Sequence, residues 1–101
     1  MPAVDQAYDD AVNLQQQGKT EEAIAKLEEL IAEEPTYALA HAALGKFYSD
    51  LEQFDKAIDH AQKVCEIEPE DPFSFTALSI VCQKAGRTAD AEQAMAVGAG
   101  T

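Results

Sequence analysis

The chain is poor in basic residues, and it has no tryptophan and no long apolar segment. Seven Lys and Arg residues stand against nineteen Asp and Glu, which gives a net charge of −12 over 101 residues. Nucleic acids and anionic lipids are bound through basic surfaces, so this balance argues against both as partners. A membrane-spanning helix needs about 18 or more consecutive apolar residues, and the sequence contains no such run. We therefore expect no nucleic-acid partner and no membrane partner.

Cysteine is scarce as well. Cys65 and Cys82 form neither a Cys-x-x-Cys pair nor a disulfide framework. We expect both to be small buried hydrophobic residues in a reducing compartment. The first residues, Met-Pro-Ala-Val-Asp, have neither the basic segment nor the apolar stretch of a signal peptide. These features together favour a soluble, cytoplasmic protein.

The motifs that mark common catalytic and cofactor sites are also missing. The sequence has no glycine-rich phosphate loop, no HExxH and no cluster of Cys and His at metal-binding spacing. Its many carboxylates lie in surface-type runs such as Glu28-Glu29 and Glu33-Glu34, which are typical of solvated helix faces. We predict no catalytic, cofactor-binding or metal-binding residues, no cofactor and no enzymatic activity.

What the chain does contain is a repeat with a period of 34 residues, which is typical of stacked structural units. Ala23, Ala57 and Ala91 follow this step, and so do Pro35 and Pro69. Other positions keep the same register, namely Ile24 and Ile58, Leu44 and Leu78, Gly18 and Gly86, and the small residues Ala11, Gly45 and Ser79. The period divides residues 1–101, taken as a single domain, into copies over about 4–37, 38–71 and 72–101.

Each copy contains two segments in which apolar residues recur at steps of three and four, the spacing of one helix face. The pattern predicts six helices, over about 4–17, 20–34, 38–51, 54–67, 72–85 and 88–97. Gly18 and Gly86-Arg87 mark turns inside the first and third copies, and Glu52-Gln53 mark the turn of the second without a glycine. No segment alternates with period two for long enough to be a strand.

The order of large, small and aromatic positions resembles the tetratricopeptide repeat. The middle copy carries the resemblance best, through Leu44-Gly45, Tyr48, Phe54, Ala57, Ala61 and Pro69. The resemblance implies an all-α fold, a right-handed superhelical α-solenoid of three antiparallel helix–turn–helix units. Gly45 and Ala57 are small where the two helices of one unit must cross closely, because bulk there would push the axes apart.

In this family the first helices of successive units line a concave groove that takes a peptide or a helix of another protein. The groove positions that the resemblance implies here are Tyr8, Val12, Leu39, Ala42, Lys46, Phe73, Thr76, Ala77, Ile80 and Lys84. One subgroup clamps a chaperone's terminal carboxylate with lysine, asparagine and arginine. The corresponding positions hold Tyr8, Val12, Ala43, Phe73 and Ala77, none of which pairs with a carboxylate. The resemblance therefore implies a protein-interaction module of another specificity.

The charge of the chain is unevenly distributed along its length. Residues 4–37 carry nine acids and two lysines, whereas residues 72–101 carry two charges of each sign. Asp5 and Asp9 would form an acidic rim at the N-terminal end of an otherwise small and apolar groove. Such a surface suits an amphipathic helix or an apolar segment that also carries basic residues. The alternative is that the large apolar side chains cover one another and bind nothing tightly.

The last helix offers a second candidate surface. Repeat arrays usually end in a polar capping helix, yet this one carries Ala91, Ala94, Met95 and Val97 with Asp90 and Glu92 as its charged residues. The alternative function is therefore self-association, in which the third repeat pairs with a second copy to form a homo-dimer.

The chain contains two histidines, His41 and His60. His41 occupies a first-helix position where the family usually carries a large aromatic residue, so we expect it to pack in the interior. We expect His60 to lie on an outer face. A site that combined His41 with Cys65 and Cys82 would require a coincidence of folding and is not predicted.

Overall fold

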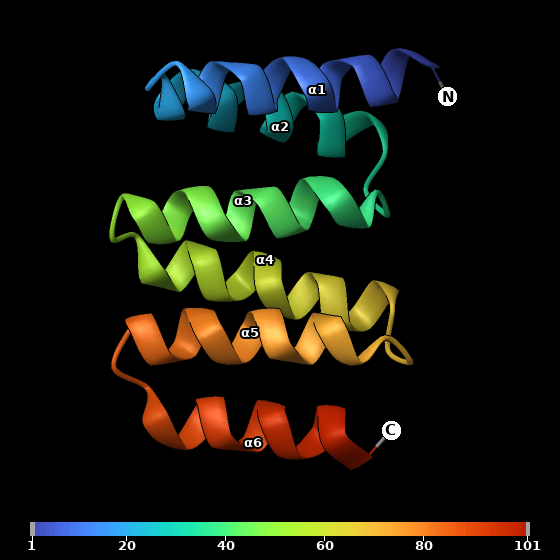
Figure 1. Cartoon of the computed structure of the whole chain (residues 1–101). Coiled ribbons are helices and arrows are strands. Elements are labelled where there is room, and N and C mark those ends of the chain that lie inside the picture. Colours follow the sequence, from blue (N-terminus) through green and yellow to red (C-terminus); the bar gives the residue numbers. More distant parts are fainter. Residues whose placement is uncertain (1, 101) are drawn as a thin grey trace.

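A computed structural model describes residues 2–100 as six helices joined by short turns (Figure 1). The helices are α1 (Pro2–Gln16), α2 (Thr20–Glu33), α3 (Ala38–Asp50), α4 (Phe54–Ile67), α5 (Pro72–Lys84) and α6 (Thr88–Gly100). Each helix begins and ends close to its predicted bounds, and no strand occurs in the described range. The predicted all-α architecture of three antiparallel helix pairs is confirmed.

The turn inside each pair uses the same backbone conformation at the same repeat position. Gly18 and Gly86 have φ angles of 82° and 79°, in the left-handed region that glycine enters without a steric penalty. Glu52 occupies the equivalent position of the second unit with a φ of 61°. The predicted turn at Glu52-Gln53 is therefore correct, and a glutamate adopts there the conformation that the other two units give to glycine.

The core follows the 34-residue repeat. Ala23, Ala57 and Ala91 are all buried, with at most 1% of their surface exposed. Gly45 of α3 lies against α4, where an added Cβ would sit 3.4 Å from the carbonyl oxygen of Ala57 and 3.9 Å from the Cβ of Ala61. At these distances even a Cβ would touch α4, so the predicted close crossing of α3 and α4 is confirmed.

The units stack through neighbouring helices. Within a unit α1 packs on α2, α3 on α4 and α5 on α6, and between units α2 packs on α3, α4 on α5, and α3 also meets α5. The result is a layered stack of 35 × 27 × 19 Å in which α1, α3 and α5 run in the same direction (Figure 1). No helix in the described range is long and apolar enough to cross a bilayer.

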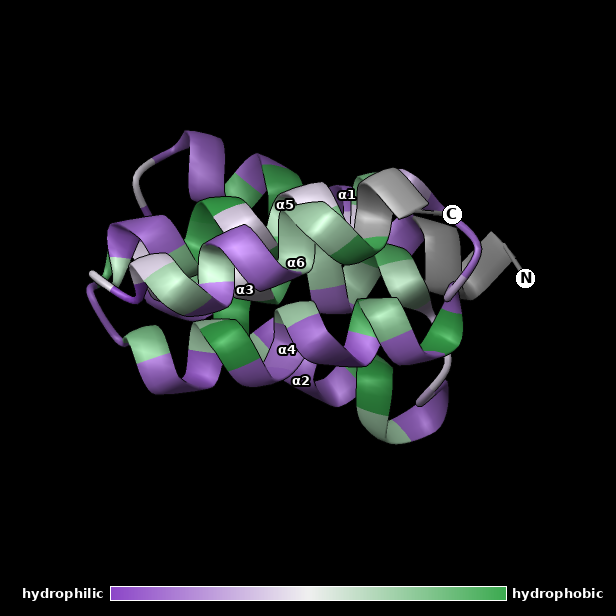
Figure 2. Cartoon of the chain, turned by 90° about the horizontal axis from the view of Figure 1, so that it is seen from below, coloured by the Kyte–Doolittle hydropathy of each residue, from purple (hydrophilic) through white to green (hydrophobic). Residues whose placement is uncertain are grey.

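The outer helices differ in polarity. In Figure 2, α2 and α4 carry much hydrophilic ribbon, whereas the later part of α6 is largely apolar up to the residues drawn in grey. The side chains of residues 1–5 and 98–101, which include the predicted rim residue Asp5, lie outside the described set.

Candidate functional site

A cleft of about 140 Å³ lies on the face where α3 and α5 run side by side. Small and apolar side chains form most of its walls, and the lining residues are Ala42, Gly45, Lys46, Ser49, Ala61, Val64, Ala77, Ile80, Val81 and Lys84. Five of the ten residues predicted for the groove, namely Ala42, Lys46, Ala77, Ile80 and Lys84, are among them. The cleft exists because Gly45 and the alanines fill little of the space between the three helices.

Its volume decides what the cleft can accept. Pockets for small-molecule ligands typically measure about 300–1,000 Å³, so 140 Å³ is too small for such a ligand. The space suits one apolar side chain presented by another polypeptide. Ile80 stands beside it with 48% of its surface exposed, a further apolar contact at the opening.

Lys46 and Lys84 line this cleft without an ion-pair partner in the described part of the chain. Other cations do find partners: Lys26 pairs with Asp10, Lys63 with Glu66 and Arg87 with Asp55. Lys19 and Lys56 also have no ion pair among the described residues, and Lys56 lies over the Tyr48 ring. What distinguishes Lys46 and Lys84 is their position beside one apolar cleft, in a chain with nineteen acidic residues. Sequence reasoning placed both lysines in the groove, but only the folded arrangement shows that they are unpaired.

The other predicted groove residues lie outside the cleft. Phe73 at the start of α5 is 78% exposed, and Leu39 at the start of α3 is 55% exposed. Tyr8 and Val12 are half-buried on α1, where the Tyr8 ring meets Tyr37 edge-on at 6.1 Å between centroids. The hydroxyl of Thr76 donates to the carbonyl oxygen of Pro72, a bond within its own helix. Tyr8 is therefore partly covered, whereas Leu39 and Phe73 remain open to contact.

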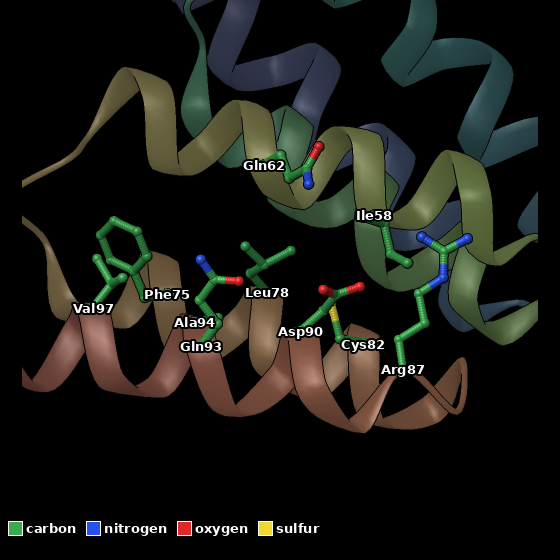
Figure 3. Close-up of a pocket in the computed structure, with 10 residues that line it drawn as sticks. All are labelled: Ile58, Gln62, Phe75, Leu78, Cys82, Arg87, Asp90, Gln93, Ala94 and Val97. Carbon is green, nitrogen blue, oxygen red and sulfur yellow. The ribbon is translucent and has the colours of Figure 1, made fainter.

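The residues predicted for self-association divide into two groups. Ala91 and Ala94 are buried, with 1% and 5% of their surface exposed, whereas Met95 and Val97 are about half exposed. A second cleft of about 290 Å³ lies between α4 and α6, with α5 behind it (Figure 3). Val97 and Ala94 reach it from α6, Phe75 and Leu78 from α5 and Ile58 from α4.

Within the described side chains the exposed large apolar residues are Leu39, Phe73, Ile80, Met95 and Val97. The first three lie on the helices α3 and α5 and the last two on α6. Ile80 lines the first cleft and Val97 the second, so each cleft has one exposed large apolar side chain beside it.

His41 and His60 form a contact that the sequence analysis did not foresee. His41 is 5% exposed, as predicted for a packing residue. The placement of His60 on an outer face is wrong, because its ring stacks on Tyr48 at 5.7 Å and its Nδ1 lies 3.1 Å from Nδ1 of His41. Their separation of 19 residues matches no motif, so no signal in the sequence points to the pair.

Burial raises the pKa of both the Cys65 and the Cys82 thiols, which disfavours the nucleophilic thiolate. Both cysteines are free and buried. Among the described residues no group of three or more His, Cys, Asp or Glu side chains is arranged to hold a metal ion.

The stack of three helix pairs has counterparts among known proteins. A family model of the tetratricopeptide repeat matches residues 14–78. The chain belongs to the tetratricopeptide-repeat family. Repeats of this family mediate protein interactions. No curated protein matches this tetratricopeptide-repeat chain.

Solved structures show the same fold at low sequence identity. The chain is similar to SycD, the type III secretion translocator chaperone of Yersinia enterocolitica in an alternative dimer, with a TM-score of 0.86 and 21% identity over 97% of this chain and 74% of that one. It is similar to the second tetratricopeptide-repeat domain of Spaghetti (RPAP3) bound to the HSP90 peptide SRMEEVD, with a TM-score of 0.83 and 18% identity over 95% of this chain and 89% of that one.

A third similar structure is longer. MamA matches with a TM-score of 0.86 and 22% identity over 96% of this chain, which spans 57% of that protein. At these identities the three structures establish the fold and do not transfer a ligand.

Proposed function

We propose that this tetratricopeptide-repeat chain is a protein-interaction module that holds a segment of a partner protein on the face formed by α1, α3 and α5. The cleft of about 140 Å³ between α3 and α5 carries the proposal, since it is apolar, too small for a metabolite and flanked by two unpaired lysines. A free lysine beside an apolar cleft is favourable for a carboxylate that a bound segment brings.

The partner segment that fits has one large aliphatic side chain in the cleft and an Asp or Glu near Lys46 or Lys84. Leu39 and Phe73 supply further apolar contact on the same helices. The exposed Asp9 on α1 favours basic residues at the other end of the segment. A segment with charges of opposite sign at its two ends would then bind in one direction. Contact through a few apolar and charged side chains is the mode of grooves that accept a helix or peptide.

The test uses random twelve-residue peptides displayed on phage and selected against the wild-type protein. The expected winners combine a Leu, Ile or Met with nearby acidic residues. Ala77→Arg fills the cleft and should lower their affinity by at least about tenfold, equivalent to about 1.4 kcal/mol. Lys46→Glu should weaken acidic peptides and should bind their lysine-substituted versions better.

The matched control is Lys63→Glu, which makes the same charge change at a half-exposed lysine of α4 that already pairs with Glu66. Equal loss of binding in Lys63→Glu and Lys46→Glu would point to net charge alone and contradict the groove. Peptides that bind Ala77→Arg as well as the wild type would contradict the cleft. The free thiols Cys65 and Cys82 favour a reducing, cytoplasmic setting for this function.

Two exposed apolar side chains of α6 favour a second function, self-association through this helix: Val97 lines the cleft between α4 and α6, and Met95 lies outside that cleft. Light scattering across a concentration series tests it: a dimer that Met95→Asp converts to a monomer supports it, and a wild-type monomer at every concentration contradicts it. Phe73→Asp on the opposite helix layer is the control.

A further inference from the structure

The two histidines of the chain meet where the first unit packs on the second. Nε2 of His41 in α3 lies 2.8 Å from the carbonyl oxygen of Pro35, in the turn between α2 and α3. Nδ1 of the same ring lies 3.1 Å from Nδ1 of His60 in α4. Nε2 of His60 in turn lies 3.5 Å from Oε1 of Glu28 in α2. Polar contacts therefore run from the connecting turn through both rings and back to the first unit.

The donors and acceptors in this arrangement limit the protons that it can hold. The carbonyl oxygen of Pro35 only accepts, so Nε2 of His41 must carry a proton. A neutral His41 then has a lone pair at Nδ1, and the proton in the bond between the rings belongs to Nδ1 of His60. Neutral His60 thus turns its Nε2 lone pair toward the Glu28 carboxylate.

The arrangement accommodates one added proton, and a second one breaks it. A proton on Nε2 of His60 faces the Glu28 carboxylate and leaves the bond between the rings intact. A second proton can go only to Nδ1 of His41, where it would oppose the proton already on Nδ1 of His60. Two donors facing each other at 3.1 Å cannot hydrogen-bond, and two adjacent positive rings repel.

Other charged and aromatic groups surround the pair. Tyr48 stacks on the His60 ring with 8° between planes, and Lys56 stands 5.4 Å above the Tyr48 ring. Burial lowers the pKa of His60; His41 adds to this effect, while Glu28 and Asp59 oppose it. Burial and Glu28, which bonds its hydroxyl, raise the pKa of Tyr48. Glu28 of the first unit therefore contacts both Tyr48 and His60 of the second.

We propose that His41 and His60 form a proton-sensitive joint between α3 and α4 of the second unit, closed while one proton lies between the rings and opened when both rings are fully protonated. Opening removes the bond between α3 and α4. The contacts of His41 with Pro35 and of His60 with Glu28 remain and still join the second unit to the first. α3 then packs less firmly on α4, and both helices line the cleft of about 140 Å³.

Ring-nitrogen NMR of the uniformly ¹⁵N-labelled wild type tests the joint. At neutral pH we expect a proton on Nε2 of His41 and on Nδ1 of His60. On lowering the pH, the second protonation should coincide with a loss of amide-exchange protection in α3 and α4. A neutral-pH His60 with its proton on Nε2 would overturn the proposal, and so would unchanged exchange protection after both rings are protonated.

A substitution of His41 separates the effect of its ring on the titration of His60 from the effect of burial. His41→Gln keeps a donor for the Pro35 carbonyl oxygen and removes the second titrating ring. The titration midpoint of His60 should then move upward, because His41 no longer opposes its protonation. An unchanged His60 titration in folded His41→Gln would refute the interaction between the two rings. If that variant does not fold, the positions of the protons in the wild type test the proposal instead. His60→Asn retains a donor at the Nδ1 position, so its helices should keep their exchange protection at acid pH.

Discussion

Gly45 of α3 faces the backbone of Ala57 in α4 so closely that a Cβ on Gly45 would lie 3.4 Å from the Ala57 carbonyl oxygen. The two residues come from the two halves of the best-matched repeat, and both are buried. Their small size sets the distance between the helix axes. That distance in turn leaves the cleft beside Ala61 and Ala77, so a core packing feature shapes the candidate binding surface.

Enlarging Ala57 tests this crossing. Ala57→Phe should destabilise the fold by about 1–3 kcal/mol or more, because overpacking forces side chains and backbone to shift. Thermal unfolding followed by circular dichroism measures the change. Ala25→Phe on an exposed position of α2 is the control and should leave the midpoint nearly unchanged. A wild-type midpoint for Ala57→Phe would contradict the crossing.

Relieving the left-handed residue in the second turn should stabilise the protein. Glu52 has a φ of 61° where the other two units place glycine. A residue with a Cβ in this region is unfavourable by about 1–2 kcal/mol, part of which is offset by the larger unfolded-state entropy of glycine. Glu52→Gly should therefore raise the free energy of unfolding by about 0.5–1 kcal/mol in urea denaturation. Gly86→Ala should lower it, and equal signs for the two variants would contradict this account.

The N-terminus of α5 has a side-chain cap that α2, α3 and α4 lack. Oδ1 of Asp71 accepts a hydrogen bond of 3.0 Å from the backbone N–H of Phe73. Asp71→Ala should cost about 1 kcal/mol of stability, and Asp71→Ser should retain most of it. Urea denaturation distinguishes the two. Equal destabilisation by Ala and Ser would show that the cap contributes little.

Stability should depend on pH through His60. Its pKa lies below the usual value of 6.5 in the folded state, so between the two values the unfolded chain binds more protons. Stability is therefore fully present above about pH 6.5 and falls as the pH drops toward the folded-state pKa. Melting temperatures measured between about pH 7.5 and pH 5.5 should decline in the wild type. His60→Asn should flatten the decline, and an equal slope in both proteins would assign it to other groups.

The helix limits and the repeat register could be predicted from the sequence because they depend on residues that are close together in the chain or recur at a fixed step. Helix limits follow from glycine at a turn, proline before a helix and apolar residues at steps of three and four. The close crossing follows from the small residues that recur every 34 positions. Leu39, Phe73 and Ile80 could be expected to face outward because the family pattern assigns these positions to the groove.

Contacts between side chains of different helices could not be predicted, because spacing along the sequence does not show which of them meet. His60 looked like an outer residue, yet two other helices meet it, α2 through Glu28 and α3 through His41 and Tyr48. Ala91 and Ala94 looked available for self-association on an apolar helix, and packing against the rest of the third unit buries both.

The sequence by itself determined that this protein is a stack of three helical pairs with a low basic content and a small, apolar first-helix surface. The 34-residue period is enough to predict this stack, because every unit repeats the same pattern of small, apolar and turn residues. Tertiary structure alone decided that Lys46 and Lys84 lie unpaired beside one cleft and that Nδ1 of His41 lies 3.1 Å from Nδ1 of His60. Both depend on distances across helix interfaces, where a shift of a few ångströms makes or removes a hydrogen bond or an ion pair.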